Sequence, residues 1–366
     1  MVNKNTIYYI YFFGGKNIHP SIEKKIHEQA EAVKKTELDI EIIVINFCKH
    51  QEYNGIKYIK CHRNQIKNKY FRYSYIANII ENIDGLIYLR YIDSDFSNLF
   101  FFKKYGSRII TEHHCMEYNE LSLVIKNKNI IKRFVKKFIE KYFHGLQYVA
   151  GHIAVTQEIL NYEQDRSMCP NGAVVSNGKN INNVKSDIFK KTKNFNKNEI
   201  NLVFVCSYFY PWHGLERLLN SPPNTNHNII INLVGHLNPE QKDLVNKFND
   251  KGSSIKIKTY GFLDKQELES LYLMADAAIA SLALYKNNMS EGSTLKSSEY
   301  LLYGLPIILG YKDQDLIKAP FTYEVSNNNS SIDFNEIYKF TINWYKNRSA
   351  TQSRNIIFDY AQEHIS

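Results

Sequence analysis

The stretch EGSTLKSSEYLLYGLP, from Glu291 to Pro306, places two carboxylates eight positions apart, with small residues, hydroxyl residues and one lysine between them. Its first part, 292–294, has the composition of a loop that caps a helix. We expect that helix from about Leu295 to Tyr303, where a Gly-x-Pro sequence ends it. The N-terminus of a helix attracts anions such as a diphosphate, and Lys296 adds a full positive charge in the first turn. The stretch therefore predicts an anion-binding loop and helix.

The spacing of Glu291 and Glu299 suits a ligand that extends on both sides of such an anion. Eight residues span roughly 12 Å at the helical rise, which is about the length of a sugar–diphosphate–ribose unit. One carboxylate would then meet sugar hydroxyls and the other the ribose diol. The alternative is an ordinary amphipathic helix with two surface glutamates.

Glu-x7-Glu followed by Tyr-Leu-x-x-Gly-x-Pro resembles the donor-site signature of retaining glycosyltransferases of family 4, which have the GT-B fold. The resemblance implies an α/β protein in which two Rossmann-like domains turn parallel sheets toward a central cleft. It also implies transfer of a sugar from a nucleotide diphosphate sugar with retention at the anomeric carbon. In that family's pattern Glu291 positions the donor sugar and Glu299 holds the ribose.

The composition agrees with a large globular protein. A length of 366 residues suffices for two domains, and 44% hydrophobic residues suffice for their cores. The chain has no apolar run as long as the roughly 18 residues that a membrane helix needs. The apolar run Ile7–Phe13 fits a buried first strand better than a signal peptide. The five cysteines are scattered without a Cys-x-x-Cys pair, which favours a reducing cytoplasm over disulfides or structural zinc.

Strands and helices alternate along the whole chain, which predicts parallel sheets covered by helices. The alternation forms two series, so we expect a first domain over 1–178, a polar linker over 179–199 and a second domain over 200–366, whose last helix packs back on the first domain. The expected strands are Ile7–Phe13, Ile40–Ile45, Gly85–Tyr91, Arg108–Thr111, His152–Val155, Ala173–Val175, Leu202–Cys206, Ile229–Val234, Ile255–Thr259, Ala277–Ala280 and Ile307–Leu309.

Further segments match the family pattern in the right order. Two of them depart from it: His213 stands where a phosphate-binding lysine is usual, and Ser176 stands where the family has proline before Asn-Gly. A literal Pro-Asn-Gly lies just upstream at 170–172, so two registers stay open. The residues that the resemblance assigns to donor binding are Gly14, Gly15, His213, Gly214, Gly235, Phe262, Gly292, Ser293, Thr294, Leu295, Lys296 and Glu299.

Two adjacent histidines follow a predicted strand of the first domain. The family often places a histidine here that touches the transferred sugar, so the resemblance assigns a catalytic role to His114 ahead of His113, beside Glu291. With Glu117 nearby, a metal site is the competing interpretation. Adjacent side chains of a strand point to opposite faces, so the two histidines are poorly placed to chelate together. We expect one histidine at the cleft and no metal; two structural histidines are the remaining alternative.

The net charge of +9 is confined to the first part of the chain, because residues 1–200 hold 31 Lys and Arg against 20 Asp and Glu. The densest part is Lys126–Lys141, with seven basic residues and one Glu. Its apolar residues recur at helical spacing, so one face is apolar and the other basic. Such a helix can lie on an anionic membrane, although a domain helix with a solvated basic face has the same pattern.

These observations favour a metal-independent enzyme that needs no cofactor besides its nucleotide sugar. We expect it to glycosylate a glycan or a lipid-linked glycan in capsule or lipopolysaccharide synthesis. It would be cytoplasmic, or peripheral on the cytoplasmic face of the inner membrane. The rivals are a nucleotide-sugar epimerase or phosphorylase on the same fold, and an inactive partner subunit, which the histidine at 213 makes conceivable. A nucleic-acid-binding protein would explain the charge but not Glu291 and Glu299, so we expect no nucleic-acid partner.

Overall fold

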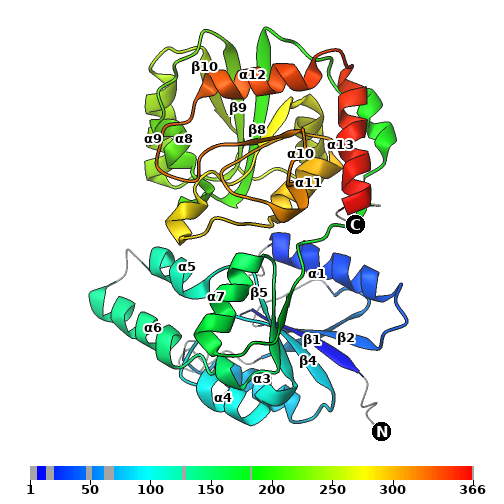
Figure 1. The fold of residues 1–366 in the computed structure, drawn as a ribbon, viewed down its shortest axis with the longest axis vertical. Helices are drawn as coiled ribbons and strands as arrows, with labels where there is room; N and C mark the ends of the chain where they lie inside the picture. The colour runs from blue at the N-terminus through cyan, green and yellow to red at the C-terminus, as the bar shows by residue number, and fades with distance from the viewer. Residues whose placement is uncertain are drawn as a thin grey trace. The chain divides into compact units, whose positions relative to one another are not determined.

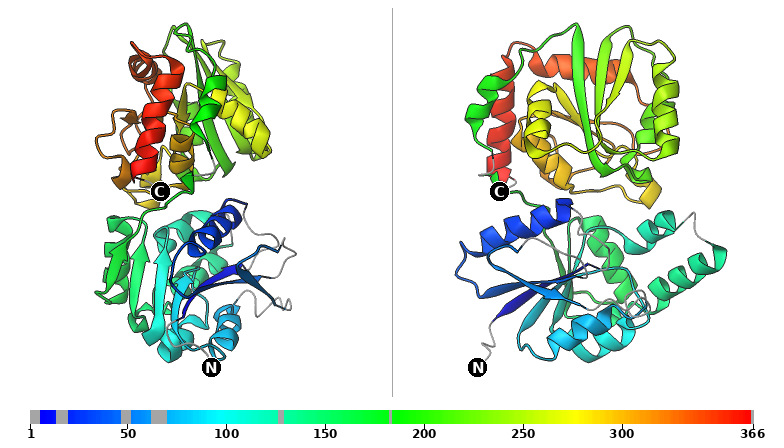
Figure 2. Two further views of the ribbon diagram at one scale, coloured as in Figure 1. Left: turned by 90° about the vertical axis from the view of Figure 1, so that its right-hand side faces the viewer. Right: turned by 180° about the vertical axis from the view of Figure 1, so that it is seen from behind.

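The computed structural model describes residues 6–13, 20–46, 52–61, 70–125, 129–181 and 184–364 (Figure 1). The chain divides into two compact units, residues 1–175 (unit 1) and 176–366 (unit 2). Each unit has its own parallel sheet with helices on both faces, as the two further views also show (Figure 2). The predicted α/β class with two Rossmann-like parallel sheets is confirmed.

Unit 1 contains a seven-stranded sheet in the order β3-β2-β1-β4-β5-β6-β7, and every paired strand is parallel. Its strands are β1 (Ile7–Phe13), β2 (Ile40–Asn46), β3 (Ile56–Lys60), β4 (Leu86–Arg90), β5 (Ile109–His113), β6 (Gly151–Ala154) and β7 (Gly172–Val174). Its helices are α1 (Pro20–Val33), α3 (Tyr73–Ile80), α4 (Asn98–Tyr105), α5 (Glu117–Val124), α6 (Ile130–Tyr142) and α7 (Gln157–Ser167).

Strand β1 shows why this sheet is covered twice. Its even-numbered side chains, such as Ile10, belong to a core that includes Tyr73 of α3 and Phe102 of α4. Its odd-numbered side chains, such as Tyr11, belong to a second core that includes Ile26 of α1. Successive side chains of a strand face opposite sides of the sheet, so a run that is apolar throughout needs helices on both faces.

Unit 2 contains a six-stranded parallel sheet in the order β10-β9-β8-β11-β12-β13. Its strands are β8 (Glu199–Tyr208), β9 (Asn228–His236), β10 (Ile255–Thr259), β11 (Ala277–Ile279), β12 (Ile307–Leu309) and β13 (Thr322–Glu324). Its helices are α8 (Leu215–Asn220), α9 (Pro239–Asn249), α10 (Lys265–Met274), α11 (Leu295–Leu302), α12 (Phe334–Tyr345) and α13 (Ala350–His364), with short 3-10 turns η4 (Ser186–Lys191), η5 (Pro211–His213), η6 (Leu284–Asn287) and η7 (Gln314–Leu316).

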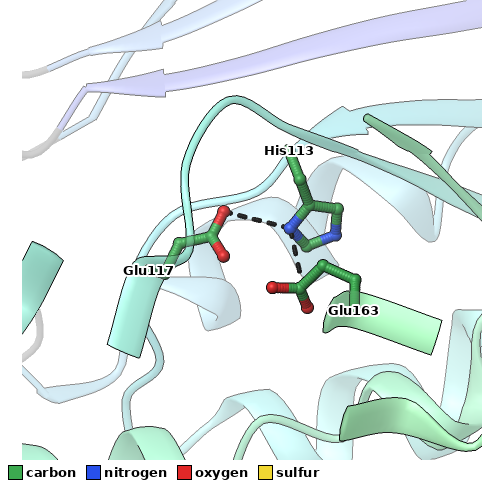
Figure 3. Close-up of side chains that lie close together, drawn as sticks. All are labelled: His113, Glu117 and Glu163. Atoms are coloured by element: carbon green, nitrogen blue, oxygen red, sulfur yellow. Dashed lines mark hydrogen bonds and ion pairs between the residues drawn. The ribbon is translucent and has the colours of Figure 1, made fainter. Parts of the chain in front are cut away.

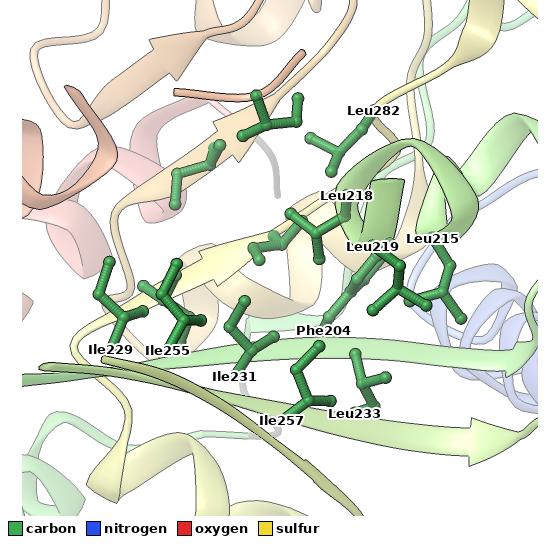
Figure 4. Close-up of a cluster of buried hydrophobic side chains, with 14 of the residues drawn as sticks. Phe204, Leu215, Leu218, Leu219, Ile229, Ile231, Leu233, Ile255, Ile257 and Leu282 are labelled. Carbon is green, nitrogen blue, oxygen red and sulfur yellow. The ribbon is translucent and has the colours of Figure 1, made fainter. Parts of the chain in front are cut away.

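One face of the unit 2 sheet forms a large apolar core, drawn in Figure 4. Leu202 and Phe204 of β8 and Ile231 of β9 pack there with Leu215 and Leu218 of α8. If the six strands β8 to β13 are numbered 1 to 6 along the chain, their order across the sheet is 3-2-1-4-5-6. The strand order therefore reverses between β8 and β11. Ligands of open α/β sheets bind at the carboxyl ends of the strands beside such a switch point.

The structure adds elements and contacts that the sequence patterns left out. The edge strands β3 and β13 were not among the expected strands, since β3 is half exposed and β13 has three residues. The stretch expected as a polar linker, 179–199, contains η4, where Phe189 is fully buried and its ring lies 5.6 Å from that of Phe358 in α13. Helix α13 packs on α11 and η4 within unit 2.

Candidate functional site

The switch point of unit 2 brings together two loops. The loop after β8 contains η5, and the loop after β11 lies against it, with Leu282 N donating to His213 O at 3.0 Å and Ala283 N donating to Trp212 O at 3.2 Å. Gly214 permits this approach: its φ is +80°, and a Cβ there would lie 2.8 Å from the Cβ of Leu282. The Trp-His-Gly motif is therefore fixed at the sheet's switch point.

Helix α11 begins next to this point, as the sequence predicted. Thr294 is its N-cap, and the Thr294 side chain accepts from Ser297 N. The capping loop is held by Asn177, whose backbone N donates to Ser293 Oγ at 2.8 Å and whose Nδ2 donates to Ser293 O at 2.7 Å. Of the two open registers, the structure thus places Asn177 at the site, while Asn171 Nδ2 donates to Ala150 O in unit 1.

Lys296 connects the helix to both neighbouring strands. Its Nζ donates to Cys206 Sγ near the end of β8 at 3.2 Å and lies 3.4 Å from Ser281 Oγ, just after β11. The same ammonium lies 5.7 Å from the ring centroid of Phe204. The first N–H groups of α11 point along the helix axis. The positive charge of Lys296 and these N–H groups therefore both lie at the switch point of the unit 2 sheet.

His213 is a neutral side chain in this setting. Burial and the nearby charge of Lys296 hold the pKa of His213 well below its usual range, and the carbonyl of Tyr208 opposes them only in part. Nδ1 accepts from Tyr210 N at 3.2 Å, which leaves the ring proton on Nε2. His213 can donate one hydrogen bond there, but it supplies no charge in place of the usual lysine.

The two glutamates of the motif lie on either side of the first turn of α11. Glu291, before the capping loop, forms a parallel bridge with Lys312, and its Oε1 accepts from Gln314 Nε2 at 3.3 Å. Glu299 lies one turn into α11 and is partly buried. Gly292 is packed against Tyr311, because a Cβ there would lie 2.9 Å from the Tyr311 ring.

A pocket of about 420 Å³ opens at the ends of β9 and β10. Gly235, at a φ of +126°, lies so close to β8 that a Cβ would overlap the Cys206 carbonyl, and its N–H donates to Gly261 O at 2.6 Å. The Phe262 ring is 61% exposed and lies at this pocket. Both residues come from the segments that the sequence analysis assigned to donor binding.

In unit 1, a pocket of about 340 Å³ lies at the ends of β4 and β5, and His114 lines it together with Arg90. His114 Nε2 lies 2.9 Å from Glu112 Oε1, which also pairs with Lys25 Nζ at 3.3 Å. Burial, and then the charge of Arg90, lowers the pKa of His114 to about 3. His114 is therefore neutral and is oriented by a buried carboxylate.

The other predicted residues of unit 1 are placed differently. His113 is fully buried and does not line the pocket; its ring nitrogens meet Thr111 and Glu117. The predicted contacts Gly14 and Gly15 lie outside the described residues. Glu112 and Lys25 were not singled out from the sequence, although Glu112 precedes the two histidines directly. Their pairing joins α1 to β5. The two residues are far apart in the chain, so no local sequence pattern predicts it.

Helix α6 confirms the amphipathic pattern predicted for Lys126–Lys141 over the part that the structure describes, 129–141. Four large apolar side chains are exposed in an i, i+4 row, Ile130, Phe134, Phe138 and Tyr142, and Ile131 is exposed next to it. Lys136 pairs with Asp93 at 2.8 Å, so it is not part of a solvated basic face. Glu140 is fully buried and pairs with Arg166. In the described residues no helix is long and apolar enough to cross a membrane.

The two Rossmann-like units define the GT-B fold of glycosyltransferases. The chain is similar over 99% of its length to sucrose-phosphate synthase of Thermosynechococcus elongatus, with a TM-score of 0.67, 12% identity and 95% of that chain covered. It is also similar to Anabaena HepE in complex with UDP-glucose, with a TM-score of 0.58, 15% identity and coverage of 99% and 95%. WaaG, a glycosyltransferase involved in lipopolysaccharide biosynthesis, matches with a TM-score of 0.59, 12% identity and coverage of 98% and 95%. No protein-family profile and no curated protein sequence matches the chain.

Proposed function

We propose that this protein is a retaining glycosyltransferase that uses a nucleotide diphosphate sugar. The observation that supports this most is the convergence of Lys296, the N-terminus of α11 and the His213 loop at the switch point of unit 2. A diphosphate needs fixed positive charge and N–H donors, and this place supplies both. Solved structures of the same fold include a complex with UDP-glucose.

In this proposal the leaving diphosphate is stabilised by groups that are already in place before the reaction. The charge of Lys296 and the first-turn N–H groups of α11 face the charge that develops as the sugar–phosphate bond breaks. Neutral His213 donates one hydrogen bond from Nε2. Glu291 orients the donor sugar, Glu299 holds the ribose diol, and the pocket beside Phe262 takes the base.

A thermal-shift panel of nucleotide sugars and nucleoside diphosphates tests the donor class. A ligand that binds only the folded state raises the melting temperature as its concentration exceeds its dissociation constant. We expect a shift with one nucleoside diphosphate and its sugar, and none with ribose 5-phosphate. A shift with oligonucleotides alone would contradict the proposal. Turnover of the stabilising nucleotide sugar with a glycan acceptor then separates a transferase from an epimerase, a phosphorylase or an inactive subunit.

We further propose that the acceptor is lipid-linked and that helix α6 rests on an anionic membrane. The exposed side chains of Ile130, Ile131, Phe134, Phe138 and Tyr142 gather on one helix, whereas apolar residues on an ordinary protein surface are scattered singly. Basic side chains flank the row: Lys132, Arg133, Lys137 and Lys141. Apolar side chains beside lysines are what an interfacial helix needs to enter the headgroup region.

Replacing Lys132, Arg133 and Lys137 by glutamine should weaken binding to anionic vesicles about a hundredfold, since each basic residue near such a surface contributes about 1 kcal/mol. Lys136 is kept, because its ion pair with Asp93 holds α6 in place. Co-sedimentation with phosphatidylserine vesicles measures the effect. Replacement of Lys185, Lys190 and Lys191, three exposed lysines at η4, is the matched control and should leave binding unchanged. Equal loss in both triple variants would refute a specific role of α6.

A further inference from the structure

Three buried side chains of unit 1 lie close together, as Figure 3 shows. His113, at the end of β5, points to Glu117 of α5 and Glu163 of α7. His113 Nδ1 lies 3.0 Å from Glu117 Oε1 and 3.8 Å from Glu163 Oε2. Within the described part of the chain, this is the one group of three His, Cys, Asp or Glu residues whose ligand atoms all lie within 4.8 Å of one another.

The hydrogen bonds behind His113 fix which of its nitrogens holds the proton. Ser167 Oγ donates to the Glu163 carbonyl at 2.6 Å, and a carbonyl only accepts. Ser167 Oγ must therefore accept from His152 Nε2, at 2.8 Å. His152 Nδ1 then accepts from Thr111 Oγ1 at 2.8 Å, and Thr111 Oγ1 accepts from His113 Nε2 at 2.9 Å. With its proton on Nε2, His113 directs the lone pair of Nδ1 at Glu117 Oε1, 3.0 Å away.

This lone pair faces two carboxyl groups, so three acceptors surround one point. Glu117 Oε2 and Glu163 Oε1 are buried without a hydrogen-bond partner, whereas Glu163 Oε2, which lies 3.8 Å from His113 Nδ1, already accepts from Arg166 Nε at 3.0 Å. In metal sites, the ring nitrogen of a histidine that does not bind the metal usually donates a hydrogen bond that orients the ring. His113 Nε2 makes such a bond to Thr111 Oγ1. Acceptors at these separations need a positive species between them.

The charges of the surroundings add to this requirement. Glu117, Glu140 and Glu163 share one guanidinium, that of Arg166, which pairs with Glu163 and Glu140 at 2.8 Å each and lies 3.9 Å from Glu117. If all three carboxyls are ionised, the cluster has a surplus of two negative charges beside a neutral His113.

We infer that His113 Nδ1 and the carboxylates of Glu117 and Glu163 bind a divalent transition-metal ion, best matched by Zn²⁺. One imidazole and two carboxylates form a ligand set that zinc accepts. With zinc–ligand distances of about 2.0–2.2 Å, ligand atoms of a tetrahedral site lie roughly 3.4 Å apart. The observed separations of 3.0 and 3.8 Å lie on either side of that value. Glu117 also lines the 340 Å³ pocket, which gives the ion a path from solvent.

The proposal departs from the expectation that unit 1 holds no metal. That expectation considered His113 with His114, and these two indeed belong to different environments; the partners of His113 come from α5 and α7. The ion would join β5, α5 and α7. It involves no residue of the proposed donor site, so the test below is independent of the donor proposal.

The full-length chain, stripped of metal with a chelator, should bind one equivalent of Zn²⁺ by isothermal titration calorimetry and melt at a higher temperature with zinc. Glu163→Gln should weaken this binding more than roughly a hundredfold, because even outer partners of metal ligands are worth 10–100-fold. Glu140→Gln is the matched control: it removes a buried carboxylate of the same cluster that is not a ligand, and it should keep one equivalent of tight binding.

Cobalt gives a second measurement that needs no variant. Co²⁺ in the site should show weak d–d absorption without the thiolate charge-transfer band that a cysteine site would add. Failure of the wild-type chain to bind Zn²⁺, Co²⁺ or Mn²⁺ would overturn the inference. Binding that Glu163→Gln leaves unchanged would place the metal elsewhere and overturn it equally.

Discussion

Lys296→Met is expected to lower kcat by roughly 100- to 1,000-fold, the usual cost of removing a preorganised group that stabilises charge in the transition state. The reason is that its ammonium is the fixed positive charge at the start of α11, beside Cys206 and Ser281. His213, where the family has a lysine, is neutral because burial and Lys296 itself lower the pKa of its imidazole. Once Lys296 is lost, the proposed site keeps the N–H groups of α11 and one histidine donor for the leaving diphosphate. The measurement is steady-state kinetics with the donor found by thermal shift.

Two further variants make this result specific. His213→Asn removes at most a neutral hydrogen bond, worth about 0.5–1.5 kcal/mol, so its kcat should fall by roughly tenfold or less. Lys247→Met, on the exposed face of α9, is the matched control for loss of a lysine and should have wild-type kinetics. If kcat falls more in His213→Asn than in Lys296→Met, position 213 would be the main group that stabilises the phosphate charge, contrary to the proposal.

The two glutamates of the motif should differ in which kinetic constant they change. Glu299→Gln should mainly raise the KM for the donor, since a contact with the ribose diol is similar in the ground and transition states. Glu291→Gln should mainly lower kcat, since the sugar that it orients changes as its bond to diphosphate breaks. A charge-assisted hydrogen bond is worth about 1.5–3 kcal/mol, so each loss should be roughly ten- to a hundredfold.

A glutamate outside the proposed site supplies the control for both variants. Glu267, on the same sheet's helix α10, is an exposed glutamate whose carboxylate accepts from Asp264 N in a capping box. Glu267→Gln removes a negative charge at a helix start outside the site, and its kinetics should match the wild type. If Glu291→Gln and Glu299→Gln also keep full activity, the spacing in the sequence is accidental and both carboxylates belong to a solvated helix face.

The sequence by itself predicted the fold class and the start of the helix in the proposed donor segment. Alternating apolar runs and helical stretches specify parallel sheets, because runs such as Ile7–Phe13 can only be buried on both faces. The start of α11 was also predicted from the sequence, since Thr294 is a good N-cap and the N-cap preference depends on neighbouring residues alone. Gly214 and Gly235 stand out in the sequence as glycines of loops, but the close approaches that need them, to Leu282 and to the Cys206 carbonyl, became visible only in the structure.

What only the tertiary structure decided depends on residues far apart in the chain. The neutrality of His213 follows from burial and from Lys296, 83 positions away. The ion pair of Lys136 with Asp93 removes one charge from a helix face that its periodicity shows as wholly basic. The cluster of His113, Glu117 and Glu163 joins β5 to α7, and its electrostatics depends on desolvation, which no sequence pattern expresses. Local geometry is encoded locally, whereas charge state and ligand sets arise from packing between distant segments.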